Sequence, residues 1–98
     1  MRMERERIIR TIKSQLPLLR DQYNVKSLGL FGSVVRGDAG EKSDIDILVE
    51  FESPIGFFDF IRLENFLSKI LGRKVDLISR KAMKSALKET ILNEIIYV

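Results

Sequence analysis

The chain has 98 residues, with 17 lysines and arginines against 14 aspartates and glutamates, and a formal net charge of +3. This length is enough for one compact core but too short for a catalytic domain joined to a separate substrate-binding domain. Cysteine and histidine are both absent, which excludes disulfide frameworks, zinc sites that need thiolate or imidazole ligands, and catalytic units built on histidine. Carboxylates and hard metal ions remain as the available chemistry.

The first residues, from Met1 to Arg7, are charged throughout and are followed by no apolar run of signal-peptide length. No segment approaches membrane-spanning length either. We therefore expect a cytoplasmic protein without membrane association. Alternating acids and bases at the start of the chain are typical of a solvated helix face.

The first predicted element is an amphipathic helix from about Met3 to Tyr23, which Pro17 is expected to kink or split. Its apolar positions follow helical spacing and form a candidate core stripe: Ile8, Ile9, Ile12, Leu16 and Leu19. A strand over Val25–Phe31 should follow.

The predicted strand ends at Gly32 and Ser33, after which the residues from Val34 to Asp38 can form a short helix capped by Ser33. A turn-rich segment, 38–43, then leads to a strand from Asp44 to Phe51. Alternation in this strand places one set of apolar side chains toward a single layer: Ile45, Ile47, Val49 and Phe51.

Pro54 and Gly56 mark a loop before a helix from about Phe57 to Leu71, which Gly72 should close. Four apolar residues of this helix share one face that should pack on the core: Phe60, Leu63, Leu67 and Ile70. We expect Phe57, Phe58 and Phe66 to lie in the core or at an interface.

The last elements are a strand from Lys74 to Ser79, a helix from about Ala82 to Leu92, and an apolar tail from Ile95 to Val98. The tail is expected to be either a short edge strand or an interface segment. Helices that alternate with strands in this order predict an α+β (mixed α/β) fold, in which helices pack on a small sheet and ligands bind near strand ends.

Gly32 and Ser33 form a candidate phosphate-binding turn. Phosphate needs backbone N–H groups that it can approach closely, and a Gly-Ser pair between a strand and a helix offers them together with a hydroxyl. Taken alone, however, Gly-Ser is also a common turn.

Asp44 and Asp46 form a candidate metal site. Residues two apart in a strand project from the same face, so the two carboxylates should lie side by side. Mg²⁺ prefers oxygen ligands and takes one or two carboxylates from a protein. A lone Asp-x-Asp is, on the other hand, often a solvated strand end.

Asp76 supplies a third carboxylate, in an apolar run where an unpaired ionised aspartate would be expensive to bury. If its strand lies beside the strand of Asp44 and Asp46, the three acids can converge. Three carboxylates next to an anion-binding turn outline a two-metal phosphoryl-transfer site, which needs no histidine.

These motifs together resemble the signature of the DNA polymerase beta-type nucleotidyltransferase superfamily: Gly32-Ser33, then Asp44-Ile45-Asp46, then Asp76 on the following strand. The longer stretch from Phe31 to Ala39, continued by the stretch from Ser43 to Val49, resembles the minimal nucleotidyltransferases (MNT), antitoxins encoded beside HEPN-domain toxins. The resemblance covers nearly the whole chain and implies a single domain over residues 1–98 with a small mixed sheet flanked by helices.

By this resemblance, Gly32 and Ser33 would bind nucleotide phosphates, and Asp44 and Asp46 would hold Mg²⁺. Asp76 would complete the metal site and help to deprotonate the acceptor hydroxyl. The family further implies transfer of AMP from ATP to a tyrosine of a partner HEPN toxin, an RNase, which silences it; an oligomer with this partner is then expected.

Arg36 and the basic residues of the last third of the chain can each be interpreted in two ways. Arg36 can reach a triphosphate oxygen, or it can cap Asp38 or pair with Glu41. The bases of the last third can meet an acidic partner or nucleic acid, but a solvated face is the favoured interpretation. They are Arg73, Lys74, Arg80, Lys81, Lys84 and Lys88.

Two other functions compete with the enzyme. The chain can be a binding module that neutralises its partner by complex formation, which joint exposure of Phe57, Phe58, Ile96, Tyr97 and Val98 would favour. It can also be a catalytic fragment that modifies nucleic acid or a small molecule. The absence of a long basic stripe disfavours a nucleic-acid substrate.

Overall fold

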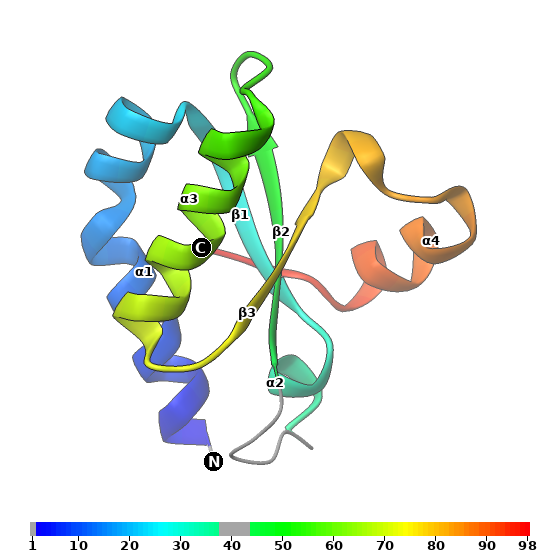
Figure 1. Cartoon of the computed structure of the whole chain (residues 1–98). Coiled ribbons are helices and arrows are strands. Elements are labelled where there is room, and N and C mark those ends of the chain that lie inside the picture. The colour runs from blue at the N-terminus through cyan, green and yellow to red at the C-terminus, as the bar shows by residue number, and fades with distance from the viewer. Residues whose placement is uncertain (1, 38–43) are drawn as a thin grey trace.

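The structure of the chain, a computed structural model, describes residues 2–37 and 44–98. Figure 1 shows helices on both faces of a small central sheet. The elements are α1 (Arg2–Tyr23), β1 (Val25–Phe31), α2 (Ser33–Arg36), β2 (Ile45–Phe51), α3 (Phe57–Leu71), β3 (Val75–Ser79), the 3₁₀ turn η1 (Arg80–Ala82), α4 (Ser85–Glu94) and β4 (Ile96–Tyr97). The predicted 38–43 turn lies outside the described residues.

Helix α1 runs unbroken through Pro17, so the predicted split of this helix is wrong. Its buried side chains, Ile8, Ile12 and Leu19, are fully enclosed by the core. Burial of this size stabilises the helix by several kcal/mol in total, which offsets the roughly 3 kcal/mol that an interior proline costs. Within the described part of the chain, no helix is long and apolar enough to cross a bilayer.

The strands form a mixed sheet with the order β3-β2-β1-β4 in the described residues. β1 pairs antiparallel with β2 and with β4, while β2 pairs parallel with β3. The tail is therefore a short edge strand, as one of the two readings predicted, and it continues with the N–H of Val98 donating to the carbonyl of Leu28 at 2.9 Å. The predicted mixed sheet is confirmed.

The two faces of the sheet carry unequal cores. Helices α1 and α3 cover one face (Figure 1), where the predicted alternation of β2 is confirmed because Ile45, Ile47 and Val49 are fully buried. Helix α4 covers part of the other face through a small cluster around Phe31, Leu48 and Ile91. The lightly covered face carries the polar residues of β2.

The C-terminal helix differs from the prediction of one helix from Ala82 to Leu92. The chain instead makes η1, passes through an extended Met83 and Lys84, and then begins α4 at Ser85. Met83 packs against the cluster under α4, and this tertiary contact interrupts the helix. Consequently Lys81 lies in η1 and Lys84 is the residue before α4, so only Lys88 of these three lysines lies within α4.

Side chains of α3 complete the hydrogen bonds of β3, which is an edge strand of the sheet. The N–H of Val75 donates to Ser68 Oγ at 3.0 Å, and the N–H of Leu77 donates to Glu64 Oε2 at 3.0 Å. Buried backbone N–H groups are costly without a partner. Glu64 and Ser68 therefore hold β3 in place, and with it Asp76, which lies between the two donors.

We predict that Glu64→Ala lowers the free energy of unfolding by about 1–2 kcal/mol, because the N–H of Leu77 loses its acceptor. Glu64→Gln keeps an acceptor oxygen and should lose much less. Urea denaturation followed by circular dichroism measures both variants against the original chain. Equal losses in the two variants would mean that the carboxylate acts through its charge and not as an acceptor.

Candidate active site

The candidate site lies where β1 ends and where β2 and β3 begin. In the sheet register Phe31 is opposite Asp46, and Asp46 is beside Asp76 on the parallel neighbour. This arrangement brings the Gly32-Ser33 turn, which follows β1, next to the aspartates of β2 and β3. The predicted adjacency of the two aspartate-bearing strands is therefore observed.

Gly32 rests directly against the carboxylate of Asp46. Its φ of 79° and ψ of −151° belong to a region that L side chains rarely adopt. A Cβ at this position would lie 2.2 Å from Asp46 Oδ2. Only glycine lets the turn pass this close to the acid.

Helix α2 is shorter than predicted, and Gly32, not Ser33, is its N-cap residue. The carbonyl of Gly32 accepts the N–H groups of Val35 and Arg36, both at 3.1 Å. Because Gly32 already supplies the required backbone geometry, no side-chain cap is made and Ser33 becomes the first helical residue. A left-handed Gly37 ends the helix.

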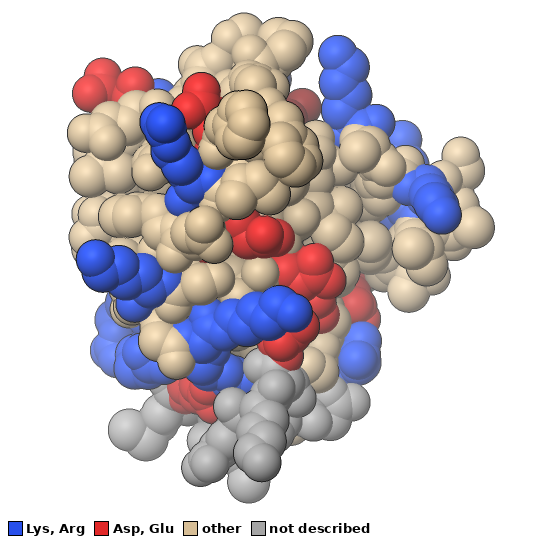
Figure 2. Space-filling view, viewed as in Figure 1, with Lys and Arg blue, Asp and Glu red and all other residues tan. Residues whose placement is uncertain are grey.

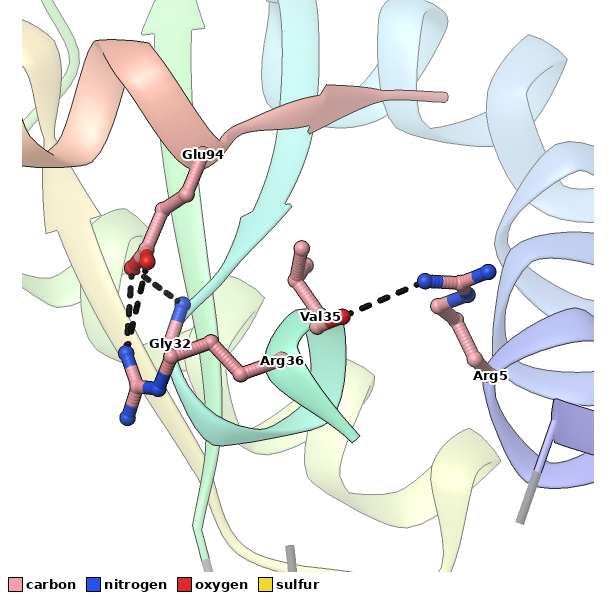
Figure 3. A network of polar contacts seen from close by, with 5 residues as sticks. All are labelled: Arg5, Gly32, Val35, Arg36 and Glu94. Carbon is pink, nitrogen blue, oxygen red and sulfur yellow. Dashed lines mark hydrogen bonds and ion pairs between the residues drawn. The ribbon is translucent and has the colours of Figure 1, made fainter. Parts of the chain in front are cut away.

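Arg5 of α1 fixes the position of α2. Its guanidinium donates to the carbonyl of Val35 at 3.2 Å, across the gap between the two helices (Figure 3). Carbonyl groups in the last turn of a helix have no partner inside the helix, so a cation there is favourable.

The three predicted aspartates differ in exposure. Asp44 lies just before β2 and pairs with Lys74 at 3.8 Å. Asp46 is half-buried, and Asp76 is exposed. Asp76 avoids the cost of burial in its apolar run, because β3 alternates and turns Val75 and Leu77 into the core instead.

The aspartates nevertheless act on one another electrostatically. Burial raises the pKa of Asp46, and the neighbouring charges of Asp76 and Asp44 raise it further, as does that of Glu94, whereas Arg36 lowers it. A carboxylate whose ionised form is destabilised by like charges is the kind of group that a cation relieves. Figure 2, which has the same viewpoint as Figure 1, shows acidic side chains gathered in the lower middle of the molecule, with lysines and arginines around them.

The donor set suits Mg²⁺ in its chemistry, since it consists of hard carboxylate oxygens beside the Gly32-Ser33 turn. Within residues 2–37 and 44–98, no three acidic side chains are grouped so that they could hold a metal ion in this structure. Metal binding by Asp44, Asp46 and Asp76 thus stays a prediction.

Glu94 is a member of the site that the sequence did not indicate. It ends α4, and its carboxylate accepts the N–H of Gly32 at 2.9 Å and pairs with the guanidinium of Arg36 at 3.3 Å (Figure 3). Glu94 is far from Gly32 along the chain and belongs to no recognisable motif. No sequence pattern could therefore have predicted its place in the site. Asp38 and Glu41, the alternative partners predicted for Arg36, lie outside the described residues.

Other bases of the last third mostly face acids or solvent. Arg73 pairs with Glu4, and Arg80 lies 3.9 Å from Glu50. Lys81, Lys84 and Lys88 are exposed. The three lysines agree with the solvated-face interpretation, whereas the side chain of Arg73 is only 11% exposed.

A hollow of about 660 Å³ lies at the far end of the strands and not at the aspartates. Its lining includes Glu50, Phe57 and Arg80. Glu50 is four residues beyond Asp46 along β2, or about 13 Å at the usual rise of a strand. The hollow is therefore separate from the candidate site.

The sequence pattern of the family described as Nucleotidyltransferase domain matches residues 8–98 of this chain. The chain belongs to the nucleotidyltransferase domain family. The match spans the Gly32-Ser33 turn and all three aspartates, so the predicted family and the predicted nucleotidyltransferase fold are both confirmed.

This nucleotidyltransferase is 46% identical over 80 residues to the protein adenylyltransferase MntA of Thermococcus cleftensis, which covers 82% of this chain and 81% of that protein. A solved structure named as a candidate minimal nucleotidyltransferase matches it with a TM-score of 0.71 and 35% identity, covering 97% of this chain and 89% of the other. These relatives confirm the resemblance to the minimal nucleotidyltransferases.

A more distant match shows the same fold. The structure is described as a tri-AMPylated HEPN toxin of Shewanella oneidensis in complex with an MNT antitoxin, and the match has a TM-score of 0.62 and 20% identity, covering 98% of this chain and 69% of the other.

We predict that Gly32→Ala destabilises the fold, by about 1–3 kcal/mol from backbone strain alone and further through the clash with Asp46. Asp46→Ala removes the clashing oxygen, so the cost of Gly32→Ala should be smaller by at least about 0.5 kcal/mol in that background. Thermal melts of the two single variants and the double variant measure this coupling. Strictly additive effects would show that the turn does not rest on the carboxylate.

Proposed function

We propose that residues 1–98 act as a single minimal nucleotidyltransferase domain that moves AMP from ATP, with Mg²⁺, to a tyrosine hydroxyl of a HEPN toxin, and thereby serve as its antitoxin. The observation that carries this proposal is the contact of the Gly32 turn with Asp46, with Asp76 beside Asp46 on the next strand. A phosphate-binding turn and two carboxylates are thus neighbours through the fold and not only through a motif.

The triphosphate of ATP would bind at the turn after β1. Gly32 offers its N–H, Ser33 its backbone N–H and hydroxyl, and Arg36 its guanidinium. Hydrogen bonds from charged or oriented donors to phosphate oxygens are among the stronger polar contacts in proteins. The fixed turn holds the nucleotide in one orientation, which is a large part of phosphoryl-transfer catalysis.

Asp44, Asp46 and Asp76 would hold Mg²⁺. This assignment is supported by the raised pKa of Asp46, which is caused by burial and by the neighbouring charges of Asp76 and Asp44. Bound Mg²⁺ supplies charge neutralisation on the triphosphate and on the pyrophosphate that leaves.

The acceptor hydroxyl would approach at Asp76. Its side chain is exposed on β3, so a tyrosine of another protein can reach it from solvent. The tyrosine oxygen attacks the α-phosphorus, a new O–P bond forms, the bond to pyrophosphate breaks, and the hydroxyl proton passes to Asp76. Asp44 and Asp46 would hold the Mg²⁺ that offsets the negative charge of the triphosphate.

The nature of the partner is supported by relatives. A protein 46% identical to this chain is named a protein adenylyltransferase. A solved complex with the same fold joins an MNT antitoxin to a HEPN toxin that is tri-AMPylated. A HEPN toxin is therefore the acceptor to test first.

The binding-module alternative rests on exposed aromatic side chains. Phe57 and Phe58 are 72% and 77% exposed at the start of α3, in contact with each other at 5.8 Å between ring centroids. In the tail, Tyr97 is 51% exposed, whereas Val98 packs against the core. Phe57 and Phe58 can serve partner docking in an enzyme equally well.

We predict that incubation with ATP, Mg²⁺ and the HEPN protein encoded beside this chain adds one or more AMP masses to that protein. Intact-mass spectrometry measures the gain. Asp46→Asn should abolish it while the complex still forms, because this change removes a ligand charge at nearly constant volume. The matched control is Asp59→Asn on α3, whose exposed carboxylate pairs with Arg62 on the surface.

A stable complex without any mass change would support the binding module and overturn the enzyme. A mass gain that survives in the Asp46→Asn variant would instead overturn the assignment of the site. Mapping the modified peptide then tests whether tyrosine is the acceptor.

We further predict that Asp76→Asn lowers the turnover number by more than tenfold and changes the dissociation constant of ATP much less. The reason is that the proton of the acceptor hydroxyl has lost its destination, whereas the triphosphate donors are unchanged. Single-turnover kinetics with the HEPN protein and calorimetric titration with ATP separate the two quantities. A loss confined to ATP affinity would contradict this role for Asp76.

A further inference from the structure

Glu94 occupies the donors that the proposed function assigns to phosphate. Its carboxylate Oε1 accepts the Gly32 N–H at 2.9 Å, and both of its oxygens lie within 3.4 Å of the Arg36 guanidinium. Figure 3 shows the side chain of Glu94 reaching from the end of α4 toward the turn after β1. A carboxylate and a phosphate oxygen are both anionic acceptors, so they compete for the same N–H groups.

We propose that Glu94 is an intramolecular competitor of the nucleotide, whose carboxylate must leave the Gly32 N–H and the Arg36 guanidinium before a triphosphate oxygen takes its place. The inference rests on the proposed function, since it takes ATP to be the ligand of this turn. It adds a residue of α4, from outside the motifs, that sets nucleotide affinity.

The burial of the pair allows this exchange. The Arg36 side chain is 52% exposed and that of Glu94 is 22% exposed, so the contact borders solvent and can be replaced without opening the core. Glu94 also adds negative charge close to Asp46. Arrival of a triphosphate would increase the repulsion on Glu94 and favour its departure.

The anchoring of α4 confines the change to the Glu94 side chain. Ile91 is buried in the cluster on this face of the sheet. Ile95 follows Glu94 and packs over Gly29, so closely that a Cβ on Gly29 would lie 2.4 Å from Ile95 Cδ1. Both anchors are apolar and independent of the carboxylate, and variants at Glu94 should therefore fold.

Calorimetric titration with ATP in the presence of Mg²⁺ tests the proposal on the full chain and three variants. Glu94→Gln removes the charge and weakens the competing contact. Glu94→Asp keeps the charge but shortens the side chain by one methylene, so that it no longer spans the distance to Gly32. Glu89→Gln, an exposed carboxylate on the same helix, controls for the change in net charge.

The expected result is a dissociation constant lowered about threefold to tenfold in Glu94→Gln, as for the loss of one partly exposed charge-assisted contact. Glu94→Asp should also bind more tightly than the original chain, and Glu89→Gln should match the original. Circular dichroism melts verify that each variant is folded.

Weaker or unchanged binding in Glu94→Gln overturns the proposal, because Glu94 would then organise the turn for the nucleotide or take no part. Tighter binding in Glu94→Gln with no change in Glu94→Asp also overturns it, since a charge effect over distance would suffice. If neither the original chain nor any variant binds ATP, the proposed function itself fails. Binding by the original chain keeps the two failures distinguishable.

Discussion

The close approach of the Gly32 backbone to the Asp46 carboxylate is the constraint on which the candidate site depends. It requires a residue without Cβ and with a left-handed φ, and it requires β1 and β2 to be antiparallel neighbours in one register. Once this contact is made, the turn after β1 lies over the first residues of β2. Turn and aspartate could not approach as closely if any other residue replaced glycine.

The unequal coverage of the sheet explains why the polar residues are accessible. Helices α1 and α3 bury one face in a continuous apolar core, which gives the strands a fixed register. Among the described residues, α4 and its small cluster cover the other face. Asp46 and Glu94 can therefore be partly buried without being sealed from a ligand. A rigid face behind an open face holds charged groups in position while leaving room for a substrate.

Charge compensation at the site is partial and comes from several elements. Lys74 faces Asp44, and Arg36 faces Glu94, whereas burial and the neighbouring charges of Asp76 and Asp44 raise the pKa of Asp46. Such residual repulsion lowers stability and is tolerated at functional sites, where a ligand of opposite charge relieves it. The hydrophobic cores of the two faces supply the stability that the site lacks.

The sequence by itself determined the strands, the long helices and the aspartate motif, because periods of two and 3.6 and a Gly-Ser turn are local properties of the chain. The sequence also indicated the protein family, because Gly32, Ser33, Asp44 and Asp46 occur at a recognisable spacing. Only the tertiary structure decided the unbroken helix at Pro17, the interruption at Met83, the exposure of Asp76 and the contact of Glu94 with Gly32. Each of these depends on packing or hydrogen bonding between residues distant in the chain, which local patterns do not encode.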